Sequence, residues 1–133
     1  MNKKKFSENC NLSFYTTIKV GGVAEYFAEP RNIEEFSDLI KWAKLNEQKY
    51  QIIGAGSNLL INNIFIRGLV ICTKKMKSLR INPYTGIVDA DSGVMLPTLS
   101  NSLAKNGLQG GEWAVGIPGT LGGAIYMLSL IHI

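Results

Sequence analysis

The sequence GIPGTLGGA, from Gly116 to Ala124, holds four of the chain's fourteen glycines in nine residues. Glycine inside a regular element costs about 0.5–1 kcal/mol relative to alanine, so this cluster predicts a backbone that turns sharply or closely approaches a ligand. Pro118 fixes its own φ and stiffens the turn. Thr120 is a candidate N-cap for a helix over 121–127. The stretch therefore predicts a glycine turn at a helix start, where N–H groups and the helix dipole suit a phosphate.

A second glycine loop, Gly54–Asn58 with the sequence GAGSN, follows a short apolar run. Two such loops in one small domain predict a bound dinucleotide or a similar cofactor, and two tight turns in an α+β domain are the alternative. The loop begins like the dinucleotide-binding fingerprint, but Leu59 takes the place of the third glycine. Neither glycine loop carries the Lys-Ser/Thr pair of a P-loop. The remaining phosphate donors are backbone N–H groups, the Ser57 hydroxyl and the Asn58 amide.

The composition predicts one ordinary globular domain. The chain has 133 residues, of which 46% are hydrophobic and 18% charged, and its net charge is +4. The basic residues gather at Lys3–Lys5 and between Lys74 and Arg80, without the interleaved aromatic residues of a stacking platform. We therefore expect solvated basic faces and no nucleic-acid partner. Since no apolar run reaches about 18 residues, we also expect no membrane association.

The reactive side chains are few. Cys10 and Cys72 are the only cysteines, they lack metal-ligand spacing, and no secretory signal precedes them, which predicts a cytoplasmic protein without a disulfide framework or a metal site. His132 is the only histidine, so no histidine-based triad forms within this chain and Ser57 lacks a base. Asp89 and Asp91 are two residues apart, and we interpret them as an edge and a turn, with paired carboxylates as the alternative.

The first part of the chain alternates predicted strands with one helix. Residues 1–11 are expected to form a loose leader. Asn32, with Glu35 three residues later, resembles a capping box and begins a helix that ends near Asn46. Strands are predicted at 23–28, 50–53 and 69–73. This order favours parallel pairing through a crossover.

The pattern changes near Thr73. Residues 77–82 and 86–90 are predicted to form a hairpin. A second helix has Pro97 in its first turn and Gly107 just after its end. The change divides a domain at 12–127 into a first lobe of about 12–73 and a second of about 74–127.

Four blocks of the sequence carry a specific family resemblance: Thr16–Gly22, Gly54–Ile61, Gly107–Glu112 and Gly116–Ala124. They occur in the same order as in the UDP-N-acetylenolpyruvoylglucosamine reductases, and together they cover roughly residues 12–127. The Gly116–Ala124 block is the most specific of them. The chain is therefore similar to this family over most of its length.

The resemblance implies an α+β fold, an FAD-binding domain of the vanillyl-alcohol-oxidase (PCMH) type in which two lobes clasp the flavin. It implies FAD as cofactor and NADPH as reductant. The implied reaction transfers a hydride to the enolpyruvyl double bond of UDP-N-acetylglucosamine enolpyruvate. The product, UDP-N-acetylmuramate, is a cytoplasmic precursor of peptidoglycan. A small-molecule UDP-sugar is thus the implied partner, and no oligomeric state is predicted.

The resemblance also implies which residues bind the cofactor. The first loop, which would hold the FAD pyrophosphate, consists of Gly54, Ala55, Gly56, Ser57 and Asn58. The second stretch would approach the pyrophosphate and the flavin ring with Gly116, Ile117, Gly119, Thr120, Gly122, Gly123 and Ala124. No metal ligand is implied.

The match ends abruptly after Met127. Residues 128–133 do not continue the family's pattern, and its catalytic arginine, serine and glutamate belong downstream, so no catalytic residue is assigned here. We expect a C-terminally truncated N-terminal piece with a foreign or misread tail, weak or no FAD retention, and no reductase activity.

Three alternatives stay open. A different flavin enzyme of the same fold class would be favoured by a His or Cys tether to the flavin. A non-catalytic FAD- or nucleotide-binding module would require the chain to be stable as it stands, unlike an inactive fragment. A basic nucleic-acid binder would show salt-sensitive DNA binding.

Overall fold

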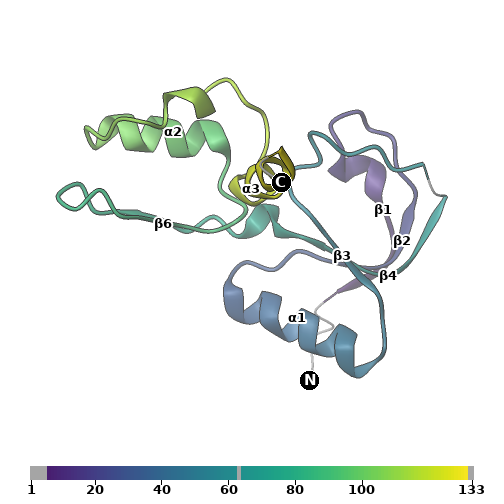
Figure 1. Ribbon diagram of the computed structural model, residues 1–133. Helices are drawn as coiled ribbons and strands as arrows, with labels where there is room; N and C mark the ends of the chain where they lie inside the picture. Colours follow the sequence, from purple (N-terminus) through teal and green to yellow (C-terminus); the bar gives the residue numbers. More distant parts are fainter. Residues whose placement is uncertain (1–5, 63, 132–133) are drawn as a thin grey trace.

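The computed structural model describes residues 6–62 and 64–131 (Figure 1). It contains two sheets, one of four strands and one of two. The elements in chain order are β1 (Ser7–Asn11), η1 (Leu12–Tyr15), β2 (Val23–Ala28), α1 (Ile33–Leu45), β3 (Tyr50–Ile53), β4 (Phe65–Cys72), η2 (Thr73–Lys75), β5 (Leu79–Ile81), β6 (Val88–Ala90), α2 (Leu96–Lys105), η3 (Glu112–Ala114) and α3 (Leu121–Ile131).

The larger sheet has the strand order β1-β2-β4-β3. β1 runs antiparallel to β2, whereas β2 and β3 both run parallel to β4, so the predicted parallel pairing is confirmed. α1 lies against one face of this sheet (Figure 1) and buries Leu39 and Ala43 against Leu69 and Ile71. β4 is buried over its last five residues, as expected for a central strand covered on both faces.

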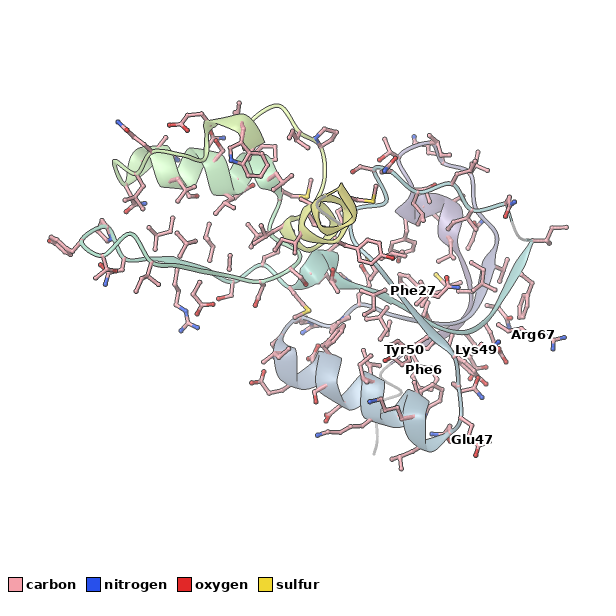
Figure 2. All side chains as sticks on the ribbon, viewed as in Figure 1. Phe6, Phe27, Glu47, Lys49, Tyr50 and Arg67 are labelled. Carbon is pink, nitrogen blue, oxygen red and sulfur yellow. The ribbon has the colours of Figure 1, made fainter. Side chains whose placement is uncertain are left out.

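The two faces of the sheet carry separate apolar clusters. Phe27 lies on the η1 side, in a cluster with Leu12, Val70 and Cys72, while Phe6 lies on the α1 side (Figure 2). Because successive side chains of a strand point to opposite faces, neighbouring residues of β4 serve different clusters. The sheet therefore holds η1 on one face and α1 on the other.

The start of α1 is capped as predicted. The Asn32 side-chain oxygen accepts a hydrogen bond from the Glu35 N–H at 2.8 Å. The Glu35 carboxylate reaches back to the N–H of Arg31 at 2.8 Å, one residue before the cap. The first bond pairs an N–H group that a helix start otherwise leaves unsatisfied, and the second ties the residue before the cap to the first turn.

We expect Asn32→Ala to lower the free energy of unfolding by about 1 kcal/mol, because the Glu35 N–H loses its acceptor. The Asn32→Asp variant is the matched control, since its carboxylate keeps the acceptor and adds a favourable charge at the helix start. Urea denaturation of the three proteins measures the difference. Equal losses in both variants would contradict the capping role.

The second half of the chain joins a hairpin to two helices (Figure 1). β5 and β6 pair antiparallel, which confirms the predicted hairpin. Asp89 is bonded to Arg80 at 2.9 Å, and the Asp91 carboxylate accepts the Ser78 N–H at 2.9 Å. Both carboxylates thus stabilise the hairpin, in agreement with an edge and a turn.

Helices α2 and α3 begin side by side. The Leu96 N–H donates to the carbonyl of Gly119 at 3.0 Å, and the Leu121 N–H donates to the carbonyl of Val94 at 2.8 Å. Pro97 lies in the first turn of α2, and Gly107 follows its end with φ of +69°, both as predicted. The contacts between the two helix starts fix where the glycine stretch lies.

Two predictions about the larger sheet were wrong. Residues 7–11 of the expected leader form β1, because their backbone pairs with β2. β4 runs from Phe65 to Cys72, whereas the strand was predicted at 69–73, and it therefore contains Gly68. Gly68 has φ of +90°, its N–H donates to the Glu25 carboxylate at 2.7 Å, and an added Cβ would collide with the Lys49 carbonyl. These contacts come from β2 and from the residue before β3, so local sequence did not reveal them.

The predicted helix over 121–127 continues to Ile131 as α3. Residues 1–5 of the leader and residues 132–133 of the tail, including His132, lie outside the described residues. No helix in the described ranges is long and apolar enough to cross a membrane.

Candidate functional site

A cavity of about 720 Å³ lies between the loop after β3 and the first turns of α3. Segments far apart in the sequence therefore form one site. Its walls combine the two glycine stretches with apolar side chains from several elements. The lining residues are Ile52–Leu59, Leu96, Trp113, Ile117–Thr120, Gly123, Ala124, Tyr126 and Met127.

The loop Gly54–Asn58 requires glycine at two positions. A Cβ on Gly54 would collide with the hydroxyl of Thr120, which belongs to the second glycine stretch. Gly56 has φ of +70°, and an added Cβ would collide with the carbonyl oxygen of Tyr15. The Gly56 carbonyl also accepts the Thr17 N–H at 3.2 Å. Both glycines thus allow the loop to pack between η1 and the start of α3.

The backbone N–H groups of Ala55–Asn58 meet no protein acceptor within the described part of the chain. An unpaired backbone N–H donates to water or to a ligand, since leaving it buried and unbonded is costly. Four successive N–H groups of this kind, beside the Ser57 hydroxyl, form a surface suited to an anion.

The N–H groups at the start of α3 were expected to be free, but they are bonded to other parts of the chain. The Gly122 N–H donates to the Ser92 carbonyl at 2.9 Å, and the Leu121 N–H is bonded to Val94. The Gly123 N–H is directed to the Thr120 hydroxyl oxygen at 3.4 Å, so Thr120 is the helix cap as predicted. These N–H groups of α3 are thus already bonded, chiefly to the segment before α2. Hydrogen-bond donors for an anion therefore come chiefly from the first loop.

Ten of the twelve predicted site residues line the cavity. All five residues of Gly54–Asn58 do so, together with Ile117, Gly119, Thr120, Gly123 and Ala124. Gly122 does not line it, because it packs on Ser92, whose Cβ would lie 2.7 Å from an added Cβ. Gly116 is also outside the lining, and nothing lies within 4 Å of its Cβ position. Gly119, with φ of +137°, forms the turn before the cap.

Apart from Ile117, sequence reasoning missed the apolar residues of the cavity wall. Trp113, Tyr126 and Met127 line the cavity while 54%, 69% and 44% exposed, respectively. Trp113 directly follows the Gly107–Glu112 block, and a bulky aromatic side chain between two glycine blocks was the available signal. Its place in the wall depends on tertiary contacts of η3, which no local pattern describes.

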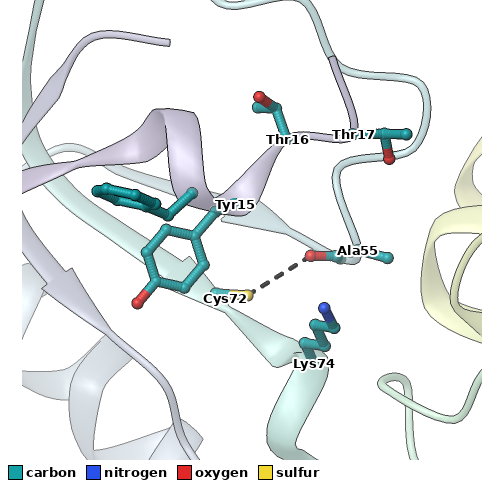
Figure 3. Close-up of a pocket in the computed structure, with 8 residues that line it drawn as sticks. Tyr15, Thr16, Thr17, Ala55, Cys72 and Lys74 are labelled. Carbon is teal, nitrogen blue, oxygen red and sulfur yellow. Dashed lines mark hydrogen bonds between the residues drawn. The ribbon is translucent and has the colours of Figure 1, made fainter. Parts of the chain in front are cut away.

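A smaller pocket of about 140 Å³ lies on the other side of the first loop (Figure 3). Tyr15, Thr17, Cys72 and Lys74 line it, and it shares Gly54 and Ala55 with the large cavity. The Cys72 thiol donates to the Gly54 carbonyl at 3.5 Å (Figure 3). Burial raises the pKa of this thiol, so Cys72 supports the loop as a neutral donor.

Tyr15 makes the stability of this region dependent on pH. Burial, followed by the nearby Glu29 carboxylate, raises the pKa of the Tyr15 phenol from 10.0 to about 12. The unfolded phenol ionises first, so the free energy of unfolding falls as the pH rises from 10 towards 12. We expect a shallower fall for Tyr15→Phe in urea titrations between pH 9 and 11.5. The raised pKa values of Cys10 and Cys72 act with the same sign, so part of the fall remains in Tyr15→Phe. Parallel curves would contradict this assignment.

Comparison with known proteins gives consistent matches. A family model described as "FAD binding domain" matches residues 24–130. A UDP-N-acetylenolpyruvoylglucosamine reductase of Prochlorococcus marinus subsp. pastoris is 69% identical over 92% of this chain and 41% of its own length. A second reductase, from Prochlorococcus marinus strain NATL2A, is 49% identical over 96% of this chain and 44% of its length. The chain therefore spans about two fifths of the length of these curated relatives.

Solved structures agree with the sequence matches. The crystal structure of UDP-N-acetylenolpyruvylglucosamine reductase (MurB) from Thermus caldophilus has a TM-score of 0.69 and 29% identity, covering 90% of this chain and 41% of that one. A Bermuda grass pollen isoallergen has a TM-score of 0.57 at 14% identity over 80% of this chain and 25% of its own, a likeness of fold alone.

The family match covers most of the described chain, and the fold agrees with it. The predicted fold class, an α+β domain of the vanillyl-alcohol-oxidase (PCMH) type, is confirmed. This chain belongs to the FAD-binding domain family and resembles the FAD-binding part of the UDP-N-acetylenolpyruvoylglucosamine reductases.

Proposed function

We propose that this chain binds FAD as part of a reductase that uses NADPH to convert UDP-N-acetylglucosamine enolpyruvate into UDP-N-acetylmuramate for peptidoglycan. The single observation that carries the proposal is the meeting of two distant glycine stretches across one cavity of about 720 Å³. The similar reductases support the reaction and the UDP-sugar substrate. We place the protein in the cytoplasm, which the free thiols of Cys10 and Cys72 support. The lobe boundary near residue 73 belongs to the same proposal.

The residues of the cavity fit the cofactor. The volume of the cavity lies within the range of about 300–1,000 Å³ that is typical of cofactor sites. Gly54 and Gly56 carry no side chain and Ala55 between them carries only a methyl group, so the start of the loop offers mainly backbone to a pyrophosphate. The apolar wall formed by Ile52, Ile117 and Met127 suits the planar rings of a dinucleotide. A polar edge thus lies beside an apolar wall, as a ligand with charged and aromatic parts requires.

We assign the residues as follows. The N–H groups of Ala55–Asn58 and the Ser57 hydroxyl hold the pyrophosphate. Gly119, Thr120, Gly123 and Ala124 form the opposite wall, where small side chains leave room for the cofactor. When bound, FAD supplies the hydride chemistry between NADPH and the substrate. This chain orients the cofactor, and we assign no catalytic residue within it.

Titration of FAD into the purified chain, followed by flavin fluorescence anisotropy, tests the proposal. We expect weak but saturable binding, with riboflavin at least 10-fold weaker because it lacks the pyrophosphate. Equal affinities for the two ligands, or no saturation with FAD, would contradict the assigned site. We also expect no NADPH oxidation dependent on the UDP-sugar from this chain alone, and steady oxidation would overturn the assignment of catalysis to other parts of the protein.

A further inference from the structure

We propose that the Trp113 ring is a stacking face for a planar heteroaromatic ring within the cavity. The inference rests on the proposed function and deepens it, because it names a residue that recognises one half of the cofactor. It comes from the position of Trp113, its hydrogen bonds and its lack of an aromatic partner.

Trp113 is carried by a short, firmly placed segment. It lies in η3 between Glu112 and Ala114, and Ala114 is only 1% exposed. An added Cβ on Gly111 would collide with the Leu103 side chain, so η3 packs closely on α2. Trp113 is 54% exposed and lines the large cavity. The backbone is thus anchored while the ring faces the site.

The polar edge of the ring is already bonded. The Trp113 indole N–H donates to the Gly110 carbonyl at 3.0 Å. The Gly110 N–H in turn donates to the Glu112 carboxylate at 2.8 Å, and Gly110 has φ of +95°. Because indole has only one donor, a ligand meets the apolar faces of this ring and not its N–H. The closed turn also limits rotation of the ring, which lowers the entropic cost of stacking.

The other tryptophan, Trp42, has a structural role and differs from Trp113 in its surroundings. Trp42 packs against Phe6 and Tyr26, with ring centroids 4.4 Å and 5.4 Å apart, on the far side of the sheet. Within the described residues Trp113 has no aromatic neighbour. Its large aromatic face is therefore available for a planar ligand, and such contacts favour offset stacking.

The matched test compares Trp113→Phe with Trp113→Leu. Both variants lose the bond to Gly110, so they differ chiefly in the aromatic face. We expect the FAD dissociation constant of Trp113→Phe to stay within about 3-fold of the parent, and that of Trp113→Leu to rise about 10-fold. Thermal melting of each protein without ligand separates this effect from loss of the fold.

Competition with ADP and with FMN then distinguishes the two rings of FAD. If adenine stacks on Trp113, the weakening in Trp113→Leu appears for ADP, and if the isoalloxazine stacks, it appears for FMN. Either result supports the proposal. Equal FAD affinities in the Phe and Leu variants would overturn the stacking role and leave the proposed function intact. Absence of FAD binding in the parent protein would overturn both.

Discussion

Replacing Gly56 with alanine is expected to lower the free energy of unfolding by about 3 kcal/mol or more. Two costs add at this position. The residue has φ of +70°, and a left-handed backbone costs an alanine about 1–2 kcal/mol. The new Cβ would also collide with the Tyr15 carbonyl and lie 2.9 Å from the Thr16 Cα. Forcing a carbon into such packing costs typically 1–3 kcal/mol more.

Gly86→Ala is the matched control. Gly86 also has φ of +70°, but nothing lies within 4 Å of its Cβ position in the β5–β6 turn. We expect this variant to lose only about 1–2 kcal/mol, the cost of the backbone conformation alone. Urea denaturation of both variants and the parent isolates the contact between the first loop and η1. Equal losses of unfolding free energy in the two variants would contradict the contact, because the backbone conformation of Gly56 alone would then explain its loss.

Replacing Ser57 with aspartate is expected to weaken FAD binding at least 100-fold. Ser57 lines the cavity, and its Oγ lies 3.9 Å from the Cβ position of Gly119 in the opposite stretch. A carboxylate there would face the proposed pyrophosphate. Two like charges about 4 Å apart repel by about 4 kcal/mol at an effective dielectric constant of 20, which exceeds a 100-fold change in affinity.

The Ser57→Asn variant keeps the shape of the aspartate without its charge. We expect it to bind FAD within about 10-fold of the parent, and we expect added salt to narrow the gap between the two variants. Flavin anisotropy titrations at two ionic strengths measure both effects. If the aspartate and asparagine variants bound FAD equally at low salt, the pyrophosphate would not lie at this loop.

Features that depend on near neighbours in the chain were predicted from the sequence. Hydrogen bonds and backbone preferences within a few residues produce the Asn32 cap, the strand Val23–Ala28, the hairpin and the end of α2 just before Gly107. The family resemblance rests on motifs of the same kind. It correctly implied the FAD-binding domain family and its fold class.

Features that depend on distant segments required the tertiary structure. β1 forms because residues 7–11 find a partner in β2, and their polar sequence carried no signal for a strand. The N–H groups of Leu121 and Gly122 were expected to be free, but Val94 and Ser92 lie beside them.

The sequence alone thus determined the glycine-rich loops, the capped helix and the family of this protein, because local backbone chemistry and motif order express them. Only the tertiary structure decided that the first loop carries the open N–H groups, that Gly116 and Gly122 lie outside the cavity lining, and that Trp113 lines the cavity. The physical reason is that a donor or a ring face is available only if no distant segment covers it, and chain folding alone settles which segments meet.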